Sequence, residues 1–199
     1  MSKRPQDHFG HRARKEGFAA RSVYKLEEID KRVKLLALGK RVLDLGAFPG
    51  SWTSYAATKV GPKGMVLGID QKEFRGALPP WAKIIMGDAL TLDLATEHGP
   101  GSFDVVLSDM APATTGHKFV DQTRSFDLFS KALAVAEVVL PAGGHFVGKI
   151  FLGPDFEQAK KDMHRIFEET KIVKPPASRL ESYETFLVGL RRRGTIKPA

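Results

Sequence analysis

The sequence contains no cysteine, which excludes disulfide bonds and zinc sites built from thiolates. It also contains no apolar run near the roughly 18 residues that a membrane-spanning helix needs. The N-terminal residues are polar and lack the apolar core of a secretory signal peptide. We therefore expect a cytoplasmic protein that does not enter a membrane, and we predict no metal site.

Two signatures of nucleotide-binding sites are also missing. A largely apolar run at residues 42–45 leads into a turn between Gly46 and Gly50. This turn has neither the GxGxxG pattern of dinucleotide sites nor the GK[ST] ending of phosphate loops. A strand that passes through a glycine turn into a helix still presents backbone N–H groups and a helix N-terminus to a ligand. The turn therefore predicts a ligand site, and the alternative is a tight connection between two core elements.

The excess positive charge lies at the two ends of the chain. The net charge of +8 includes +7 in residues 1–41, where 12 Lys or Arg stand against 5 Asp or Glu, and +4 in residues 191–197. Basic ends on a mildly acidic body indicate contact with nucleic-acid phosphates, unless the ends are only solvated tails. The composition divides the chain into three parts: a basic flexible arm (1–17), a single domain (18–190) and a basic tail (191–199).

Hydrophobic patterns predict strands that alternate with helices along most of the chain. The predicted strands are 41–45, 65–69, 82–86, 103–107, 145–151, 171–174 and 185–190. The predicted helices are 19–33, 51–59, 122–140 and 154–170. This alternation is typical of an α/β protein with a parallel, doubly wound sheet. The last two strands have no helix between them, so we expect one antiparallel strand at the edge of a seven-stranded, mostly parallel sheet.

Aspartates lie at or near the ends of four predicted strands, where open α/β sheets bind their ligands. They are Asp44, Asp70, Asp88 and Asp109. Asp70 lies 24 residues after Gly46, the spacing at which an acidic group meets ribose hydroxyls in nucleoside-binding folds. Asp88 is placed to accept an adenine amino group. Each aspartate alone is more often a turn or capping residue, but together they predict an adenosine-containing ligand. Without a pyrophosphate loop, S-adenosylmethionine fits better than a dinucleotide.

Lys149 stands within HFVGKIFL, a run that is otherwise apolar enough for a central strand. Burying a lysine charge is costly, so this position indicates a functional group. The alternative is a lysine that extends to solvent at the end of the strand. The functional interpretation directs Lys149 into the cleft beside Asp109.

Five motifs occur in order along the chain: ARSVYKLEEID, DLGAFPGSW, SDMAP, GGHFVGKIF and SRLESYETFLV. Together with DHF and RARKEGF, they resemble the FtsJ/RrmJ-type ribose 2′-O-methyltransferases over nearly the whole chain. The resemblance implies a Rossmann-like S-adenosylmethionine-dependent methyltransferase fold and methyl transfer to a ribose 2′-hydroxyl in RNA. The chain departs from the family at Phe48 and Ser51, where a small residue and a glycine are common.

The resemblance also implies a catalytic Lys-Asp-Lys-Glu set. By motif, its first three members fall on Lys25, Asp109 and Lys149. The family glutamate directly precedes the last strand, which favours Glu184, with Glu181 as the alternative. Our hypothesis is that Lys149 takes the hydroxyl proton while Asp109 and Glu184 orient it. Lys25 would position the ribose or steady the developing oxyanion.

The resemblance places the methionine part of the cofactor at the glycine turn, the ribose at Asp70 and the adenine at Asp88. The predicted cofactor-binding residues are Asp44, Gly46, Ala47, Pro49, Gly50, Trp52, Asp70, Asp88 and Asp109. For Trp52 the alternative is a core aromatic that follows the turn. The predicted RNA-binding residues are Arg12, Arg14, Lys15, Arg21 and Arg179.

The substrate implied by the resemblance is a uridine of 23S ribosomal RNA, either as free RNA or in the large ribosomal subunit. We expect a monomer without an obligate protein partner. A tRNA ribose methyltransferase is the nearest alternative, since the same four residues serve both substrates. A dehydrogenase is disfavoured by the missing GxGxxG, and a non-catalytic RNA-binding or assembly protein is disfavoured by the complete catalytic set.

Overall fold

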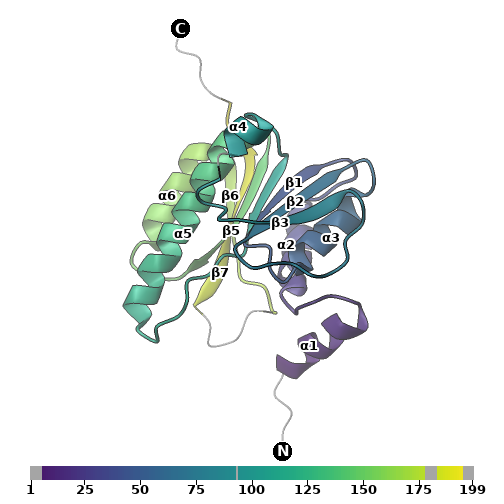
Figure 1. The fold of residues 1–199 in the computed structure, drawn as a ribbon. Helices are drawn as coiled ribbons and strands as arrows, with labels where there is room; N and C mark the ends of the chain where they lie inside the picture. Colours follow the sequence, from purple (N-terminus) through teal and green to yellow (C-terminus); the bar gives the residue numbers. More distant parts are fainter. Residues whose placement is uncertain (1–5, 93, 178–182, 195–199) are drawn as a thin grey trace, which may run out of the picture.

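Seven strands and six helices make up the part of the chain that the computed structural model describes, residues 6–92, 94–177 and 183–194 (Figure 1). The strands are β1 (Arg41–Leu45), β2 (Met65–Asp70), β3 (Ala82–Met86), β4 (Val105–Ser108), β5 (His145–Phe151), β6 (Phe167–Val173) and β7 (Glu184–Arg192). The helices are α1 (Gln6–Lys15), α2 (Val23–Val33), α3 (Ser51–Val60), α4 (Leu94–His98), α5 (Lys118–Val139) and α6 (Phe156–Ile166). Each predicted strand and helix overlaps an observed one, and α1 and α4 are additional.

The strands form one sheet in the order β3-β2-β1-β4-β5-β7-β6. The first five pair in parallel, whereas β7 is antiparallel to both β5 and β6. The predicted seven-stranded, mostly parallel α/β sheet is therefore confirmed. The predicted place of the antiparallel strand was wrong, because β7 lies between β5 and β6, and the edge strand β6 runs in the same direction as β5.

The chain reaches the position of β7 by a crossover followed by a hairpin. After β5 the chain crosses through α6 to β6 and leaves space for one strand, and the β6–β7 hairpin returns into that space. Sequence order shows the hairpin but not the strand beside which it inserts. The insertion sets Glu184, the first residue of β7, opposite Phe151, the last residue of β5.

Residues of the central strands alternate between two hydrophobic clusters, one on each face of the sheet. In β1, Val42 packs in the cluster that includes α2 and α3, and Leu43 packs in the cluster that includes α5 and α6. Val105 and Val106 divide in the same way in β4. Figure 1 shows these helix pairs on opposite faces of the sheet. Because both faces are covered, the central strands are apolar on both sides rather than amphipathic.

The N-terminal residues differ from the predicted flexible arm, because residues 6–15 form helix α1. Ala13 is buried, and Phe9 packs on Tyr24 of α2 with ring centroids 5.6 Å apart. Phe9 and Ala13 are four positions apart, so they share one face of the helix. Two apolar positions among so many basic residues were too few for the sequence pattern to predict this helix.

At the C-terminal end, β7 continues through Arg192, so the first two basic residues of the predicted tail belong to the sheet. Residues 195–199 lie outside the described part of the chain. Within residues 6–92, 94–177 and 183–194, no helix is both long and apolar enough to cross a membrane.

We expect Gly189→Ala to lower the free energy of unfolding by about 1–3 kcal/mol, the usual cost of overpacking a core. A Cβ atom at this position of β7 would overlap the ring of Phe167, which is fully buried in the neighbouring strand β6. Urea unfolding followed by circular dichroism measures the change. Gly10→Ala is the matched control, because a Cβ atom there meets no heavy atom within 4 Å and alanine favours the helix. Equal stability of both variants would contradict this packing.

Candidate active site

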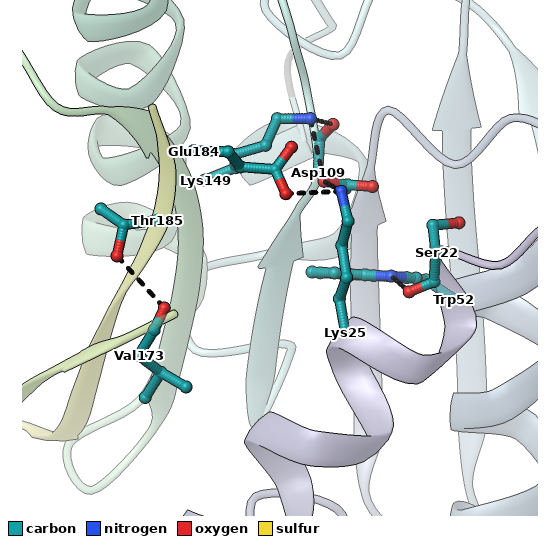
Figure 2. A network of polar contacts seen from close by, with 8 residues as sticks. All are labelled: Ser22, Lys25, Trp52, Asp109, Lys149, Val173, Glu184 and Thr185. Atoms are coloured by element: carbon teal, nitrogen blue, oxygen red, sulfur yellow. Dashed lines mark hydrogen bonds and ion pairs between the residues drawn. The ribbon is translucent and has the colours of Figure 1, made fainter. Parts of the chain in front are cut away.

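Four charged side chains meet at the carboxyl edge of the parallel strands (Figure 2). Lys25 comes from α2, Asp109 directly follows β4, Lys149 lies in β5 and Glu184 begins β7. They are the four residues that the family resemblance predicted as catalytic, and the structure brings them into one cluster. Glu181, the alternative to Glu184, lies outside the described residues.

Asp109 connects the two lysines of this cluster. Its Oδ1 atom lies 2.9 Å from Nζ of Lys149 and 3.9 Å from Nζ of Lys25. Lys149 Nζ also donates to the main-chain carbonyl of Asp109. Lys25 Nζ in turn lies 2.6 Å from Oε1 of Glu184. Two ammonium groups and two carboxylates therefore form one continuous set of contacts in which the formal charges cancel.

Both lysines are largely withdrawn from solvent, with Lys149 6% and Lys25 9% exposed. Lys149 does not extend to solvent at the end of its strand, because its ammonium ends on Asp109. Burying an unpaired ammonium is costly, and removing one partner of a buried pair leaves that cost uncompensated. Each lysine therefore depends on the carboxylate that faces it.

Two hydrogen bonds from the start of α3 hold the segment that leads into α2. Trp52 Nε1 donates to the carbonyl of Ser22, and the N–H of Ala20 donates to Oγ of Ser51, both at 2.8 Å. Trp52 is 3% exposed and packs in the hydrophobic cluster that includes α2, and a part in cofactor binding stays a prediction. Ser51, where the family often has glycine, contributes the other bond. Together these bonds fix the start of the helix that carries Lys25.

A cavity of about 410 Å³ lies beside the charged cluster, beyond the ends of the central strands. Its volume is typical of sites for small ligands and cofactors. Of the predicted cofactor-binding residues, Gly46, Asp70, Asp88 and Asp109 line it. The others lie outside its lining: Asp44, Ala47, Pro49, Gly50 and Trp52. In the described part of the chain, no group of three or more His, Asp or Glu is arranged to hold a metal ion.

Asp70 and Asp88 combine a role in their turns with a place in the cavity wall. Asp70 accepts hydrogen bonds from the N–H groups of Phe48 and Lys72, both at 2.9 Å. Asp88 accepts one from the N–H of Leu90, also at 2.9 Å. The turn bonds hold each carboxylate where it lines the cavity. The turn-capping and ligand-binding interpretations therefore describe the same residues.

At the glycine turn, the first backbone N–H groups are not free to bind a ligand, and Gly46 instead allows close packing. The N–H groups of Gly46 and Ala47 donate to the carbonyl of Ile69 at 2.9 and 3.1 Å, so they are already engaged within the protein. The strand–turn–helix pattern had predicted that such N–H groups face a ligand. Gly46 has φ of +79°, and a Cβ atom there would lie 2.7 Å from Cγ of Met110. Only glycine suits this backbone and leaves room for Met110 at the cavity wall.

Asp44 is fully buried behind the turn. Its Oδ2 accepts a hydrogen bond from Oγ1 of Thr53 at 2.7 Å, and its Oδ1 has no hydrogen-bond partner within the described residues. Burial raises the pKa of Asp44 to about 7, against the effect of hydrogen bonding with Thr53, and the charges of Asp109 and Asp70 raise it further. Gly68 leaves the space that Thr53 occupies, since a Cβ atom there would lie 2.8 Å from the threonine hydroxyl.

One basic residue of α1, Arg12, contacts α2, the helix that carries Lys25. Tyr24, which precedes Lys25, has the guanidinium of Arg12 4.5 Å above its ring and donates to Glu16 at 2.9 Å. Arg12 also pairs with Glu16 at 2.8 Å. The other predicted RNA-binding residues that the structure describes are Arg14, Lys15 and Arg21, and Arg179 lies outside the described residues.

Three residues that support this site were not predicted from the sequence. Thr53 bonds to Asp44, Met110 fills the space beside the glycine turn, and Gln122 of α5 donates through Nε2 to the carbonyl of Leu152 after β5. Met110 lies within the SDMAP motif, which was a usable signal. Thr53 and Gln122 are ordinary polar residues of helices, and nothing in their local sequence marks them.

Comparisons with known proteins find one family over most of the chain. Residues 18–192 match the model of the FtsJ-like methyltransferase family. A protein of Sorangium cellulosum, named Ribosomal RNA large subunit methyltransferase E, is 50% identical over 195 residues, which cover 98% of this chain and 92% of that protein. A protein of Oleidesulfovibrio alaskensis with the same name is 50% identical, with coverage of 96% and 94%.

Solved structures give the same fold. A crystal structure from Plasmodium falciparum, described as that of a ribosomal RNA methyltransferase, aligns with a TM-score of 0.76 at 25% identity and covers 89% of this chain and all of its own. Fibrillarin of Aeropyrum pernix, solved with natively bound S-adenosyl-L-methionine, aligns with a TM-score of 0.53 at 15% identity and covers 78% of this chain and 68% of its own. At that identity the likeness shows the fold alone.

We expect Asp44 to make the protein less stable as the pH rises from about 4 to about 7. The raised pKa means that the folded state keeps a proton which the unfolded chain has already released, so the free energy of unfolding falls by up to about 1.4 kcal/mol per pH unit. The contribution is complete below the unfolded pKa and is lost as the pH approaches the folded one. Asp44→Asn has no proton to lose and still accepts a hydrogen bond, so it should remove this slope. Urea unfolding of both proteins between pH 4 and 8 measures it, and identical slopes would refute the assignment.

Proposed function

Because the chain belongs to the FtsJ-like methyltransferase family, we propose that it transfers the methyl group of S-adenosyl-L-methionine to a ribose 2′-hydroxyl of 23S ribosomal RNA. The observation that carries the proposal is the contact among Lys25, Asp109, Lys149 and Glu184 beside a cavity of cofactor size. The names of full-length relatives at 50% identity support large-subunit ribosomal RNA as the substrate.

The residues around the cavity suit this cofactor. S-adenosyl-L-methionine supplies an electrophilic methyl group on a sulfonium centre. Asp70 and Asp88 line the cavity with carboxylate acceptors for ribose hydroxyls and the adenine amino group. Gly46 lines the cavity at the end of β1, where the resemblance places the methionine part, and Asp109 lines the cavity where it adjoins the charged cluster.

The charged cluster provides the proton chemistry. A ribose hydroxyl is a poor nucleophile until its proton is leaving, so a positioned base and in-line alignment are needed. In our proposal Lys149 first gives up one ammonium proton to solvent, and the proton of the ribose O2′ then moves to its Nζ while O2′ forms its bond to the methyl carbon and the sulfur–methyl bond breaks. Asp109 holds Nζ of Lys149 in place. Lys25, paired with Glu184, stabilises the negative charge that develops on O2′.

The resemblance also supports finer assignments. We propose that the target nucleotide is a uridine, that the substrate is free ribosomal RNA or the large subunit, and that the enzyme acts as a monomer. A ribosomal substrate also supports a place in the cytoplasm.

One experiment tests the activity and its substrate together. Labelled S-adenosyl-L-methionine is supplied with ribosomal subunits, free ribosomal RNA and tRNA in parallel reactions, and the modified nucleotide is then mapped. We expect label at a ribose 2′-oxygen of 23S ribosomal RNA. Label confined to tRNA would replace the proposed substrate, and no label in any RNA would refute the activity.

Lys149→Ala should lower the rate of methylation at least about 100-fold, since it removes the proposed base. Affinity for S-adenosyl-L-methionine should stay nearly unchanged, because Lys149 does not line the cavity. Methyl incorporation and calorimetric titration measure the two quantities. Lys40→Ala is the matched control and should keep full activity. Lys40 pairs with Asp104 at 3.4 Å, and it lies just before β1, at the amino ends of the parallel strands. Activity retained by Lys149→Ala would remove this residue from the proposed role.

The basic residues of α1 should contribute to RNA affinity through phosphates. Truncating the helix would remove Phe9 and Ala13 from the core, so point substitutions test the charges more cleanly. Arg14→Gln with Lys15→Gln should weaken RNA binding and reduce the salt slope by roughly 0.7–0.9 for each phosphate that is no longer neutralised. Arg165→Gln, which removes an exposed charge paired with Glu137 at 3.1 Å, is the control. An unchanged slope would leave α1 without a part in RNA binding.

A further inference from the structure

An exposed aromatic side chain directly precedes Glu184, which is half-buried. Tyr183 is 48% exposed, although tyrosine usually buries most of its ring. Nζ of the exposed Lys118, at the start of α5, lies 4.3 Å from the centre of this ring. The two residues come from segments far apart in the sequence and meet beside the charged cluster. Together they form a flat aromatic surface with a positive charge above it.

Hydrogen bonds fix this pair relative to the strand that carries Lys149. The carbonyl of Tyr183 accepts a bond from the N–H of Leu152 at 2.8 Å, directly after β5. The carbonyl of Leu152 accepts from Nε2 of Gln122. Lys118 lies four residues before Gln122 in α5, so both lie on the same face of the helix. Tyr183 and Lys118 are thus held to the end of β5 from two sides.

The loop between Asp109 and α5 is also held in place. The carboxylate of Asp121 accepts bonds from the N–H and hydroxyl of Thr115 at 2.8 and 2.9 Å, and from the N–H of Gly116 at 3.3 Å. Asp121 itself is 8% exposed in the first turn of α5. These bonds fix the last part of the loop to the first turn of α5, the turn that carries Lys118.

The cofactor cavity does not extend to Tyr183 and Leu152, so their side of the charged cluster is available to the RNA substrate. The cavity is lined by residues at or after the ends of β1, β2, β3 and β4 and by Leu128 of α5, whereas Tyr183 and Leu152 adjoin β7 and β5. The charged cluster lies between the two. An RNA ribose that approaches Lys149 from the β5–β7 side brings its neighbouring bases toward Tyr183, which directly precedes Glu184 of the cluster. Exposed aromatic rings with nearby cations bind nucleobases by stacking, with little dependence on sequence.

We propose that Tyr183 and Lys118 form a stacking platform for a nucleobase next to, or on, the ribose that is methylated. This inference rests on the proposed function, because it assumes an RNA substrate at the charged cluster. The ring of Tyr183 stacks on the base, and the ammonium of Lys118 strengthens the stack and attracts the adjoining phosphate. The platform holds the strand so that one ribose faces Lys149.

Two substitutions of Tyr183 separate stacking from other roles. Tyr183→Ala removes the ring and should raise the Kd for a 23S ribosomal RNA transcript, and the KM for RNA in methylation, about tenfold. Tyr183→Phe keeps the ring and should stay within twofold of the wild type. The KM for S-adenosyl-L-methionine should not change in either variant. Matching circular dichroism spectra and melting temperatures show that each variant is folded.

Lys118→Gln tests the cation and should raise the same Kd about threefold. Lys59→Gln is its matched control, because Lys59 forms another lysine–tyrosine pair, with Nζ 5.2 Å from the ring centre of Tyr55. This pair lies near the end of α3, at the amino ends of the parallel strands and away from the charged cluster. It should leave RNA binding unchanged. Equal losses from both lysine variants would mean that only net charge matters, and would overturn the platform.

Abasic RNA identifies the base. A set of oligonucleotides spans the mapped target, and each lacks one base. One of them should bind the wild type about tenfold more weakly than the intact oligonucleotide does, whereas Tyr183→Ala should bind that abasic RNA and the intact RNA equally. If Tyr183→Ala binds and methylates RNA like the wild type, the platform does not exist and the exposed ring serves another partner, such as a protein. If the wild type methylates no RNA, the proposed function fails, while the Kd values for the transcript still decide whether the platform binds RNA.

Discussion

The carboxylate of Asp109 is the contact on which the site depends, because it lies between two buried ammonium groups. Without it, Lys25 and Lys149 would face each other in a region of low dielectric constant, where like charges repel strongly. Glu184 supplies the second negative charge from the opposite direction. The cluster is therefore a balanced set of four charges, and the two buried lysines depend on the two half-buried carboxylates.

The sheet topology makes this balance possible. Parallel strands bring Asp109 and Lys149 to one edge, as expected when each strand is followed by a crossover. Glu184 reaches the same edge only because β7 enters the sheet antiparallel to β5 and begins where β5 ends. If β6 had paired with β5 instead, β7 and its Glu184 would lie one strand farther from Lys149. The departure from a fully parallel sheet is thus the feature that completes the charged cluster.

Much of this could be predicted from the sequence, and the exceptions have physical causes. Apolar runs located the central strands, and ordered motifs selected Lys25, Asp109, Lys149 and Glu184, which the structure brings together. The position of β7 was missed because strand order is a tertiary choice that local patterns do not encode. Helix α1 was missed because its two apolar residues, Phe9 and Ala13, are buried by tertiary packing that the local sequence does not show. Trp52 remained ambiguous because an indole after a glycine turn suits a ligand or a core equally well.

The missing side chain at Gly68 has an effect at a distance from its own strand. Its backbone conformation is open to any residue, so the reason for glycine is the room that Thr53 and Ala47 take, each 2.8 Å from where a Cβ atom would be. A methyl group there would push the threonine hydroxyl from Asp44 and remove a hydrogen bond that favours its ionised form. A change of purely steric origin would thereby become a change in protonation. The absence of one methyl group in β2 thus preserves a hydrogen bond that lowers the pKa of a buried acid on the neighbouring strand, against the larger effect of burial.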